Sequence, residues 1–363
     1  MKDIKTICFM GFYRPVAPRD KVYIGGLKKR GVNVLECVDN TPGLAKFFNI
    51  ARKYREQGKR CDILWVGYAS AMVVPLARLL TRRKIVWNAG NSWYETAILD
   101  RAIHRLFSLA AFAIWCVDFL AFHSADLIIL ESAAQKRYIS KQFWVKEGKL
   151  AVVYTGADET VFHPDPTVAK NKTFTVIFRG MFLPATGVEF VIEAARLLKN
   201  EDVNFRLIGW GEPLQGKIKK MIAGYNLSRV YLTTVFMPAD ELRRNMLSAH
   251  VMLGAFGNNE RLERTIQHKT FEALALGMSY ITRDSESNRE LLTDGVNVRF
   301  VPPADPKALA AAIMALKNDA SLREKLARGA RILHETKFTG GILAAEVENF
   351  CNSFSGRQSP GAL

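Results

Sequence analysis

Residues 174–198, FTVIFRGMFLPATGVEFVIEAARLL, join a predicted strand to a predicted helix through a loop that contains two glycines. The apolar run 174–178 has the length of a buried strand, and Gly180 ends it. Apolar residues then recur at helical spacing, so a helix is predicted from Gly187 to Lys199. The free N–H groups and the dipole at such a helix N-terminus favour an anion, which makes this loop a candidate phosphate site.

Strand and helix patterns alternate on both sides of this stretch. Before it, residues 4–12, 61–68 and 84–89 predict strands, and the first of them ends at Gly11. After it, residues 204–211, NFRLIGWG, predict another strand that ends in two glycines. Strands that alternate with helices are typical of parallel βαβ units.

The polar stretch HPDPTVAKNKT, residues 163–173, is interpreted as a linker between two such halves. The sequence therefore predicts an α/β protein with two tandem doubly wound, Rossmann-like domains. Their predicted bounds are 1–163 and 164–340, and a C-terminal helix and tail follow at 341–363. Because ligands of these sheets bind at the carboxyl ends of the strands, we expect a ligand cleft between the two domains.

The composition is globular and strongly basic. Of 363 residues, 49% are hydrophobic, and 51 Lys and Arg against 35 Asp and Glu give a net charge of +16, which excludes wholesale disorder. Residues 1–150 hold 25 Lys and Arg against 12 Asp and Glu, so most of the excess lies there. Residues 46–60, KFFNIARKYREQGKR, interleave aromatic and cationic side chains, and a helix of this kind can lie on an anionic membrane. A solvated basic face is the alternative; we expect no nucleic-acid partner, because no nucleic-acid motif is recognised.

Cysteine usage and the apolar stretches suggest a compartment. The five cysteines form no CxxC pair and are odd in number, which argues against a disulfide framework or zinc site and fits a reducing environment. The N-terminal stretch lacks the apolar core of a signal peptide. Residues 106–122, LFSLAAFAIWCVDFLAF, are too short for a membrane span and predict a buried helix or a helix partly dipped into a membrane surface. We expect a cytoplasmic protein, peripheral on the inner face of the membrane.

The segment 260–297, ERLERTIQHKTFEALALGMSYITRDSESNRELLTDGVN, carries the side chains with the clearest chemistry. Arg264 and Lys269 lie before or within a short predicted helix that holds Glu272, and such cations could neutralise a diphosphate. A carboxylate on that helix could accept both hydroxyls of a ribose. The alternative is that Glu272 only pairs with Lys269.

These segments together resemble the glycosyltransferases of group 1, family 4, which have the GT-B fold. The resemblance covers nearly the whole chain and is strongest from about 150 to 316. It is carried by residues 152–164 (VVYTGADETVFHP), 176–198, 205–211 (FRLIGWG), 248–257 (SAHVMLGAFG) and 269–313, and in the first half by 92–101 (SWYETAILDR) and 124–139 (SADLIILESAAQKRYI).

The resemblance implies transfer of a sugar from a nucleotide diphosphate sugar to a lipid-linked, polysaccharide or other glycan acceptor, with no cofactor and no obligatory metal. With the other strand ends, the donor-binding candidates are Gly11, Gly180, Gly187, Gly209, Gly211, Thr234, Arg264, Lys269, Thr270 and Glu272. The acceptor-side candidates are Arg14, Asn88, Asn91 and Tyr94. Glu95 and Asp20 are the candidate catalytic carboxylates.

The sequence departs from the family pattern at three positions. Met181 stands where an Arg is usual, Thr186 where a Lys or His is usual, and Arg264 where the first of two glutamates often stands. The changes at Met181 and Thr186 remove phosphate contacts and leave Arg264 and Lys269 to carry more. Two alternatives therefore stay open: a nucleotide-sugar epimerase of the same fold, and a degenerate, non-catalytic sugar-binding member.

Overall fold

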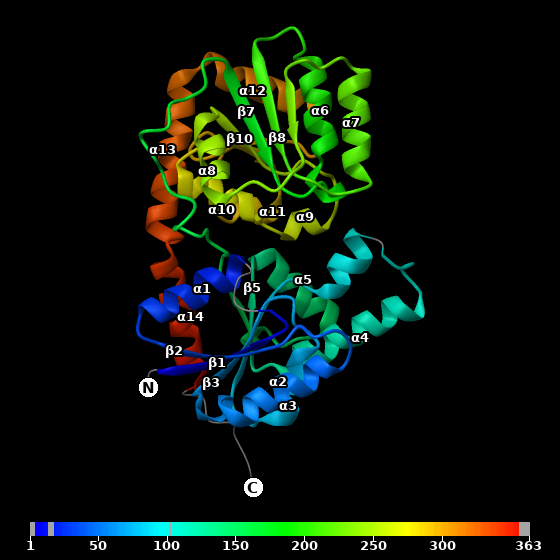
Figure 1. Cartoon of the computed structure of the whole chain (residues 1–363), viewed down its shortest axis with the longest axis vertical. Coiled ribbons are helices and arrows are strands. Elements are labelled where there is room, and N and C mark those ends of the chain that lie inside the picture. The colour runs from blue at the N-terminus through cyan, green and yellow to red at the C-terminus, as the bar shows by residue number, and fades with distance from the viewer. Residues whose placement is uncertain (1–3, 14–17, 102, 356–363) are drawn as a thin grey trace. The chain divides into compact units, whose positions relative to one another are not determined.

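The structure is a computed structural model that describes residues 4–13, 18–101 and 103–355. It contains two compact units, each with a six-stranded parallel sheet and flanking helices (Figure 1). The first unit extends to Gly156 and resumes at Thr339, and the second spans Ala157–Phe338. The predicted α/β class, with two doubly wound units in tandem, is confirmed.

The first sheet has the strand order β2-β1-β3-β4-β5-β6. Its strands are β1 Thr6–Gly11, β2 Asn33–Val38, β3 Ile63–Val66, β4 Ile85–Gly90, β5 Leu127–Leu130 and β6 Leu150–Val152. Strands β3, β4 and β5 are buried along their whole length, as expected where helices cover both faces of a parallel sheet. The chain order reverses between β1 and β3, which makes their carboxyl ends the expected place for a ligand.

The helices of the first unit form two groups. They are α1 Pro18–Lys29, α2 Ala45–Glu56, α3 Val73–Leu80, α4 Leu109–Ser124, α5 Ala133–Phe143 and α14 Gly340–Ser355, with short segments at Gly58–Arg60, Glu95–Asp100 (π-helical) and Glu147–Lys149. Helix α3 packs against both α2 and α4, whereas α1 packs against α14. Ser108 caps α4, since its hydroxyl accepts a hydrogen bond from the Ala111 N–H.

The second sheet has the strand order β12-β11-β10-β7-β8-β9. Its strands are β7 Phe174–Arg179, β8 Val203–Ile208, β9 Val230–Thr233, β10 Val251–Leu253, β11 Ser279–Arg283 and β12 Arg299–Val301. Its helices are α6 Val188–Leu197, α7 Leu214–Gly224, α8 Ala239–Ser248, α9 Arg261–Arg264, α10 His268–Leu276, α11 Glu286–Arg289, α12 Pro306–Asn318 and α13 Ala320–Lys337, with a 3-10 turn at Pro184–Thr186. Helix α6 packs against α7 and α12, and α10 packs against α13.

The C-terminal helix belongs to the first unit, although the sequence suggested a separate element at 341–363. Helices α1 and α14 lie side by side (Figure 1). A Cβ on Gly26 of α1 would lie 2.6 Å from the Gly340 carbonyl oxygen of α14, so the missing side chain permits this close approach. Arg30 also donates to Glu348 at 2.6 Å.

The chain passes from the first unit to the second between residues 156 and 157, rather than at the predicted 163/164. Residues 157–163 pack with the second unit. The Arg179 guanidinium lies 5.6 Å from the Phe162 ring centroid, and Glu159 lies 3.2 Å from the buried His334.

Residues 106–122 do not form the buried helix that was one of the two interpretations of this stretch. Helix α4 begins only at Leu109, and Phe107 and Leu109 are 97% and 89% exposed. The apolar pattern alone could not predict this exposure, because the sequence does not show whether another element covers the outer face of the helix. No helix within the described ranges is long and apolar enough to cross a bilayer.

Candidate functional site

The carboxyl end of β7 is joined to α10 by a bidentate ion pair between Arg179 and Glu272. Arg179 Nε donates to Glu272 Oε2 at 2.8 Å, and Nη2 donates to Oε1. Glu272 is 5% exposed, so both carboxylate oxygens are fixed in a nearly dry setting. The alternative that Glu272 only pairs with Lys269 is wrong, since the Glu272 carboxylate pairs with Arg179. Each carboxylate oxygen keeps a further lone pair that can accept from a ligand hydroxyl.

Lys269 is a buried cation at the same strand end. Its Nζ is 3.9 Å from the centroid of the Phe178 ring and 3.4 Å from the Gly254 carbonyl oxygen. Burial is the main cause that lowers the pKa of Lys269 to about 7; the Arg179 charge acts in the same direction, and Glu272 opposes both. An anion beside this ammonium would therefore stabilise its protonated form.

Gly180 keeps the space in front of Lys269 open. It has φ 139°, which an L side chain rarely adopts, and a Cβ there would lie 3.3 Å from Lys269 Nζ. Arg179, Gly180, Lys269 and Glu272 are thus brought together at one strand end. Gly180, Lys269 and Glu272 were among the sequence candidates, whereas Arg179 was missed.

The other candidate glycines allow neighbouring loops to approach one another. A Cβ on Gly209 would clash with the Gly180 carbonyl oxygen, and one on Gly211 would lie 2.7 Å from the Phe182 carbonyl oxygen. Gly187 has φ 62° and lies directly against the backbone of Gly257. These glycines therefore shape the strand-end loops of β7, β8 and β10, and Gly187 precedes the free N-terminus of α6.

The remaining donor-side candidates make contacts of their own. Arg264 ends α9, with Nη1 3.9 Å from Glu260 Oε2. Thr234 follows β9 and is half-buried. The Thr270 hydroxyl lies 3.0 Å from the Tyr280 hydroxyl inside the unit. Thr186, which replaces the usual cation, accepts from the Leu183 N–H and donates to the Leu183 carbonyl, so it closes the loop.

A second residue that sequence reasoning missed is Arg283, at the end of β11. Its guanidinium donates to the Gly257 carbonyl oxygen at 2.8 Å and is paired with Glu263. Glu263 also accepts from the Glu286 N–H at 3.2 Å. Glu263 is therefore used to fix the loop between β10 and α9, which leaves Glu272 as the carboxylate of the cluster.

In the first unit, Asp20 belongs to a buried polar network. It accepts from Asn88 Nδ2 at 2.7 Å and from the Tyr68 N–H at 2.7 Å, and Arg19 donates to the Asn88 side chain. Burial raises the pKa of Asp20, an effect opposed first by the hydrogen bond from Asn88. Asp20 and Asn88 are 2% and 0% exposed, so the geometry favours a positioning role in which they hold the turn after β3.

Glu95 is likewise enclosed. It is 0% exposed, and the Gln135 side chain donates to its Oε2 at 2.7 Å. Nearby, Asp118 accepts from the Tyr94 N–H at 2.7 Å, and burial raises the pKa of Asp118 to about 7. These carboxylates hold the segment after β4. Gly11 ends β1 against Ser70, in the first unit. Arg14 lies outside the described residues.

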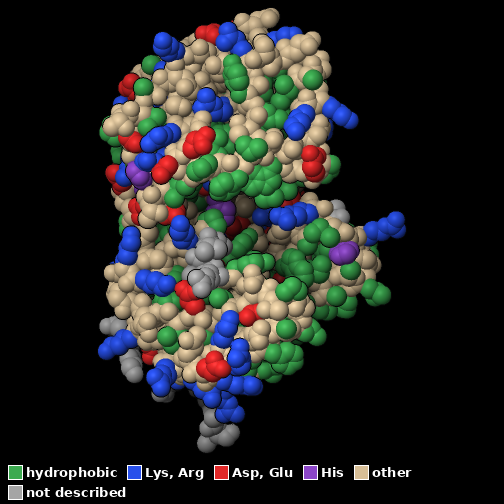
Figure 2. Space-filling view, in the orientation of Figure 1, with side chains coloured by type: hydrophobic (Ala, Val, Ile, Leu, Met, Phe, Trp, Pro, Cys, Tyr) green, Lys and Arg blue, Asp and Glu red, His purple; other side chains and the backbone are tan. Residues whose placement is uncertain are grey.

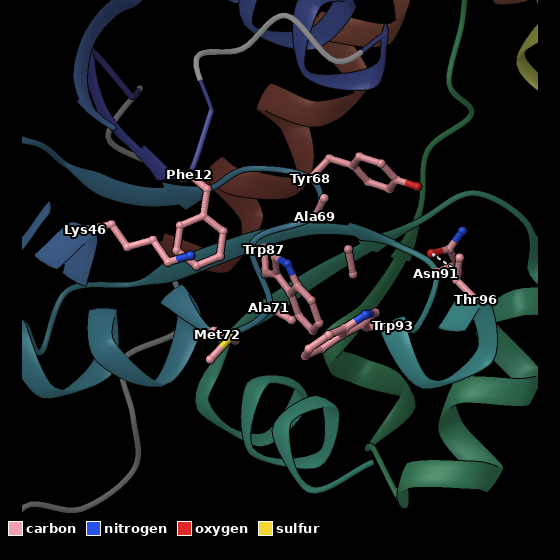
Figure 3. A pocket seen from close by; sticks show the side chains of 11 residues that line it. Phe12, Lys46, Tyr68, Ala69, Ala71, Met72, Trp87, Asn91, Trp93 and Thr96 are labelled. Carbon is pink, nitrogen blue, oxygen red and sulfur yellow. Dashed lines mark hydrogen bonds between the residues drawn. The ribbon is translucent and has the colours of Figure 1, made fainter. Parts of the chain in front are cut away.

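A cavity of about 390 Å³ opens at the carboxyl ends of β1, β3 and β4. Figure 3 shows the indoles of Trp87 and Trp93 across it, Phe12 and Lys46 on one side, and Asn91 and Thr96 on the other. Trp87 Nε1 is buried and has no hydrogen-bond partner among the described residues. Ala69, also in the wall, has φ 57°, a strained conformation for a non-glycine residue that is common at ligand sites.

This cavity contains one of the acceptor-side candidates directly, namely Asn91. Tyr94 lines a separate groove with Leu106 and Phe107. Asn88 is buried within β4. The sequence did not point to Trp87 or Trp93 as lining residues. The signal was available, because Trp87 lies within the predicted strand 84–89 and Trp93 follows that strand.

Solved structures of glycosyltransferases share this architecture. The crystal structure of HepE from Anabaena in complex with UDP-glucose has a TM-score of 0.74 at 16% identity, and the match covers 96% of this chain and 100% of that chain. The chain therefore has the GT-B fold of two Rossmann-like units.

The second unit is similar to a known family of enzymes. Residues 162–332 match the family model described as Glycosyl transferases group 1. The putative colanic acid biosynthesis glycosyltransferase WcaL of Escherichia coli K12 is 29% identical over 196 residues, which are 52% of this chain and 47% of that protein. The amylovoran biosynthesis glycosyltransferase AmsK of Erwinia amylovora is 24% identical over 53% of this chain and 48% of that protein. The chain spans about half the length of the curated relatives it matches.

Proposed function

We propose that this protein transfers a sugar from a nucleotide diphosphate sugar to a glycan or lipid-linked acceptor, without a cofactor or an obligatory metal. The observation that carries the proposal is the set of half-buried Arg179 with buried Lys269 and Glu272 at one strand end of the second unit. It combines two cations with one fixed carboxylate, in a place where ligands of doubly wound sheets bind.

The cluster offers complementary contacts to both polar parts of such a donor. Glu272 would accept hydrogen bonds from the ribose hydroxyls. Lys269, the N-terminus of α6 and Arg264 would neutralise the diphosphate. Negative charge grows on the diphosphate as the bond to the sugar breaks, so cations already held in place lower the barrier.

UDP-sugars are the first donors to test. HepE was solved with UDP-glucose, and it shares the fold with this chain. The same architecture does not determine the base, so GDP, ADP and CMP compounds belong in the same screen.

The cavity of the first unit is the proposed acceptor side. Sugar rings present an apolar face that packs on aromatic side chains, and Trp93, which is 42% exposed, offers such a surface. Asn91 and Thr96 could hydrogen-bond to acceptor hydroxyls. WcaL and AmsK are named for colanic acid and amylovoran biosynthesis, which supports a glycan acceptor.

One observation favours a second candidate, a non-catalytic sugar-binding protein. Met181 is 48% exposed where the family pattern has a cation, and Thr186 is used to close its own loop. A calorimetric screen of UDP, GDP, ADP, CMP and their sugars separates the outcomes. Selective binding followed by release of the nucleotide with an acceptor supports the transferase. Binding without turnover supports the second candidate, and no binding by any compound contradicts both.

A further inference from the structure

Large apolar side chains project from the first unit around the start of α4. Phe107, Leu109 and Phe112 are 97%, 89% and 63% exposed. The apolar ridge is defined here as Ile103, Leu106, Phe107, Leu109, Phe112, Leu120 and Trp144, all of them exposed. Figure 2 shows hydrophobic side chains gathered over this region, with Lys and Arg side chains beside them. A contiguous exposed apolar surface of this kind marks an interaction site.

The apolar ridge is held in place by contacts between aromatic rings. The ring of Trp115 stacks on those of Phe112 and Phe119, with centroids 6.3 and 5.2 Å apart, and meets Trp144 edge-on at 6.0 Å. Trp144 reaches this place because it ends α5 in the left-handed region, with φ 51°. Beside these rings, Tyr94, Leu106, Phe107 and Phe112 line a shallow groove of about 380 Å³.

Cations flank the apolar ridge in the sequence and the fold. Arg101 and Arg105 precede α4 and are exposed, and Lys141 and Lys146 are exposed on either side of Trp144. Lys149 donates to the carbonyl oxygens of His123 and Ala125 at the end of α4. Exposed aromatic residues with Lys and Arg beside them match the interfacial zone of an anionic bilayer.

We propose that the apolar ridge inserts into the interfacial region of an anionic membrane and anchors the first unit there. A second copy of the chain fits less well, because a symmetric contact would bring Arg101 and Arg105 close to their own equivalents. The proposal concerns membrane attachment and does not rest on the proposed transfer reaction.

The inference also revises the role of the basic helix α2. That helix packs on α3, and α3 packs on α4, so all three belong to one helical layer. The α2 cations Arg52 and Arg55 would then attract the protein to the anionic membrane over a longer range, whereas the side chains of the apolar ridge would insert into it. The two contributions differ in their response to salt, since only the electrostatic one is screened.

Vesicle co-sedimentation of the full chain tests the proposal. Vesicles of phosphatidylcholine with phosphatidylglycerol are compared with pure phosphatidylcholine. The Phe107→Ser/Leu109→Ser variant should bind the anionic vesicles roughly 10- to 100-fold more weakly, because each large apolar group in the acyl region contributes about tenfold or more. The Leu197→Ser/Ile332→Ser variant, which removes two exposed apolar side chains of the second unit, should bind like the parent.

Thermal unfolding of the same variants shows whether each remains folded, and this readout does not depend on the proposed reaction. Weakened vesicle binding with an unchanged melting temperature supports the proposal. Equal vesicle binding by the ridge variant and the parent overturns it. The proposal is also overturned if only an Arg52→Gln/Arg55→Gln variant loses vesicle binding. It is overturned as well if the ridge variant changes only by forming a smaller oligomer, as measured by sedimentation velocity.

Discussion

Arg179 holds Glu272 through two parallel hydrogen bonds that join the end of β7 to α10. The pair places a carboxylate and a guanidinium at the edge of the sheet with little freedom to rotate, since Glu272 is buried and Arg179 lies over the Phe162 ring. A site that must bind a ribose and a diphosphate benefits from groups that are ordered before the ligand arrives.

Glu272→Ala should weaken nucleotide diphosphate-sugar binding by about 1.5–3 kcal/mol, the contribution of hydrogen bonds to a charged group. Isothermal titration calorimetry measures the change. Glu335→Ala, which removes the carboxylate of an exposed ion pair with Arg331, is the matched control and should leave binding unchanged. Unchanged affinity in a folded Glu272→Ala variant would remove Glu272 from the donor site.

Arg179→Lys tests the geometry of the pair rather than its charge. A single ammonium cannot reproduce the two parallel hydrogen bonds, so Glu272 should lose its fixed orientation. We expect weaker donor binding by roughly tenfold, with nearly the same melting temperature. Parental affinity in Arg179→Lys would show that positive charge alone is sufficient at this position.

The depressed pKa of Lys269 predicts proton uptake on donor binding. Free Lys269 has a pKa of about 7 because of its burial, and a bound diphosphate should raise it. Affinity should therefore fall as the pH rises from about 7 to 9, where the free protein no longer carries this proton. Titrations in buffers of different ionisation enthalpy measure the uptake directly, and Lys269→Met should abolish the part that belongs to Lys269.

The same residue predicts a pH dependence of stability with a definite sign. Above pH 7 the folded protein has released the Lys269 proton, whereas the unfolded chain still holds it. The unfolding free energy of the parent relative to Lys269→Met should therefore rise by about 1.4 kcal/mol per pH unit between about pH 7 and 9. Urea denaturation of both proteins at the two pH values measures this difference, in which the other titrating groups cancel. A flat difference would show that Lys269 titrates normally.

The sequence was sufficient for the architecture because strand and glycine signals are local. The run at 174–179 and the loop glycine at 180 predict β7 and its turn from neighbouring residues alone. Lys269 and Glu272 were found for a similar reason, since a short helix presents them at a fixed spacing.

The features that were missed depend on contacts between distant segments. Arg179 and Glu272 are 93 positions apart, and neither shows its partner in the sequence. The return of α14 to α1 is of the same kind, because only the packed structure shows which face receives the last helix. The exposure of Phe107 and Leu109 could not be predicted either, since an apolar pattern does not reveal an uncovered face.

Two adjacent glycines of α1 should respond in opposite ways to the same substitution. A Cβ on Gly25 would have no heavy atom within 4 Å, so Gly25→Ala should stabilise the helix by about 0.5–1 kcal/mol. A Cβ on Gly26 would lie 2.6 Å from both Ala344 Cβ and the Gly340 carbonyl oxygen, so Gly26→Ala should destabilise by about 1–3 kcal/mol through overpacking against α14. Urea denaturation of the two variants measures both values. The pair tests the docking of the C-terminal helix, because Gly26→Ala would gain stability like Gly25→Ala if α14 did not pack there.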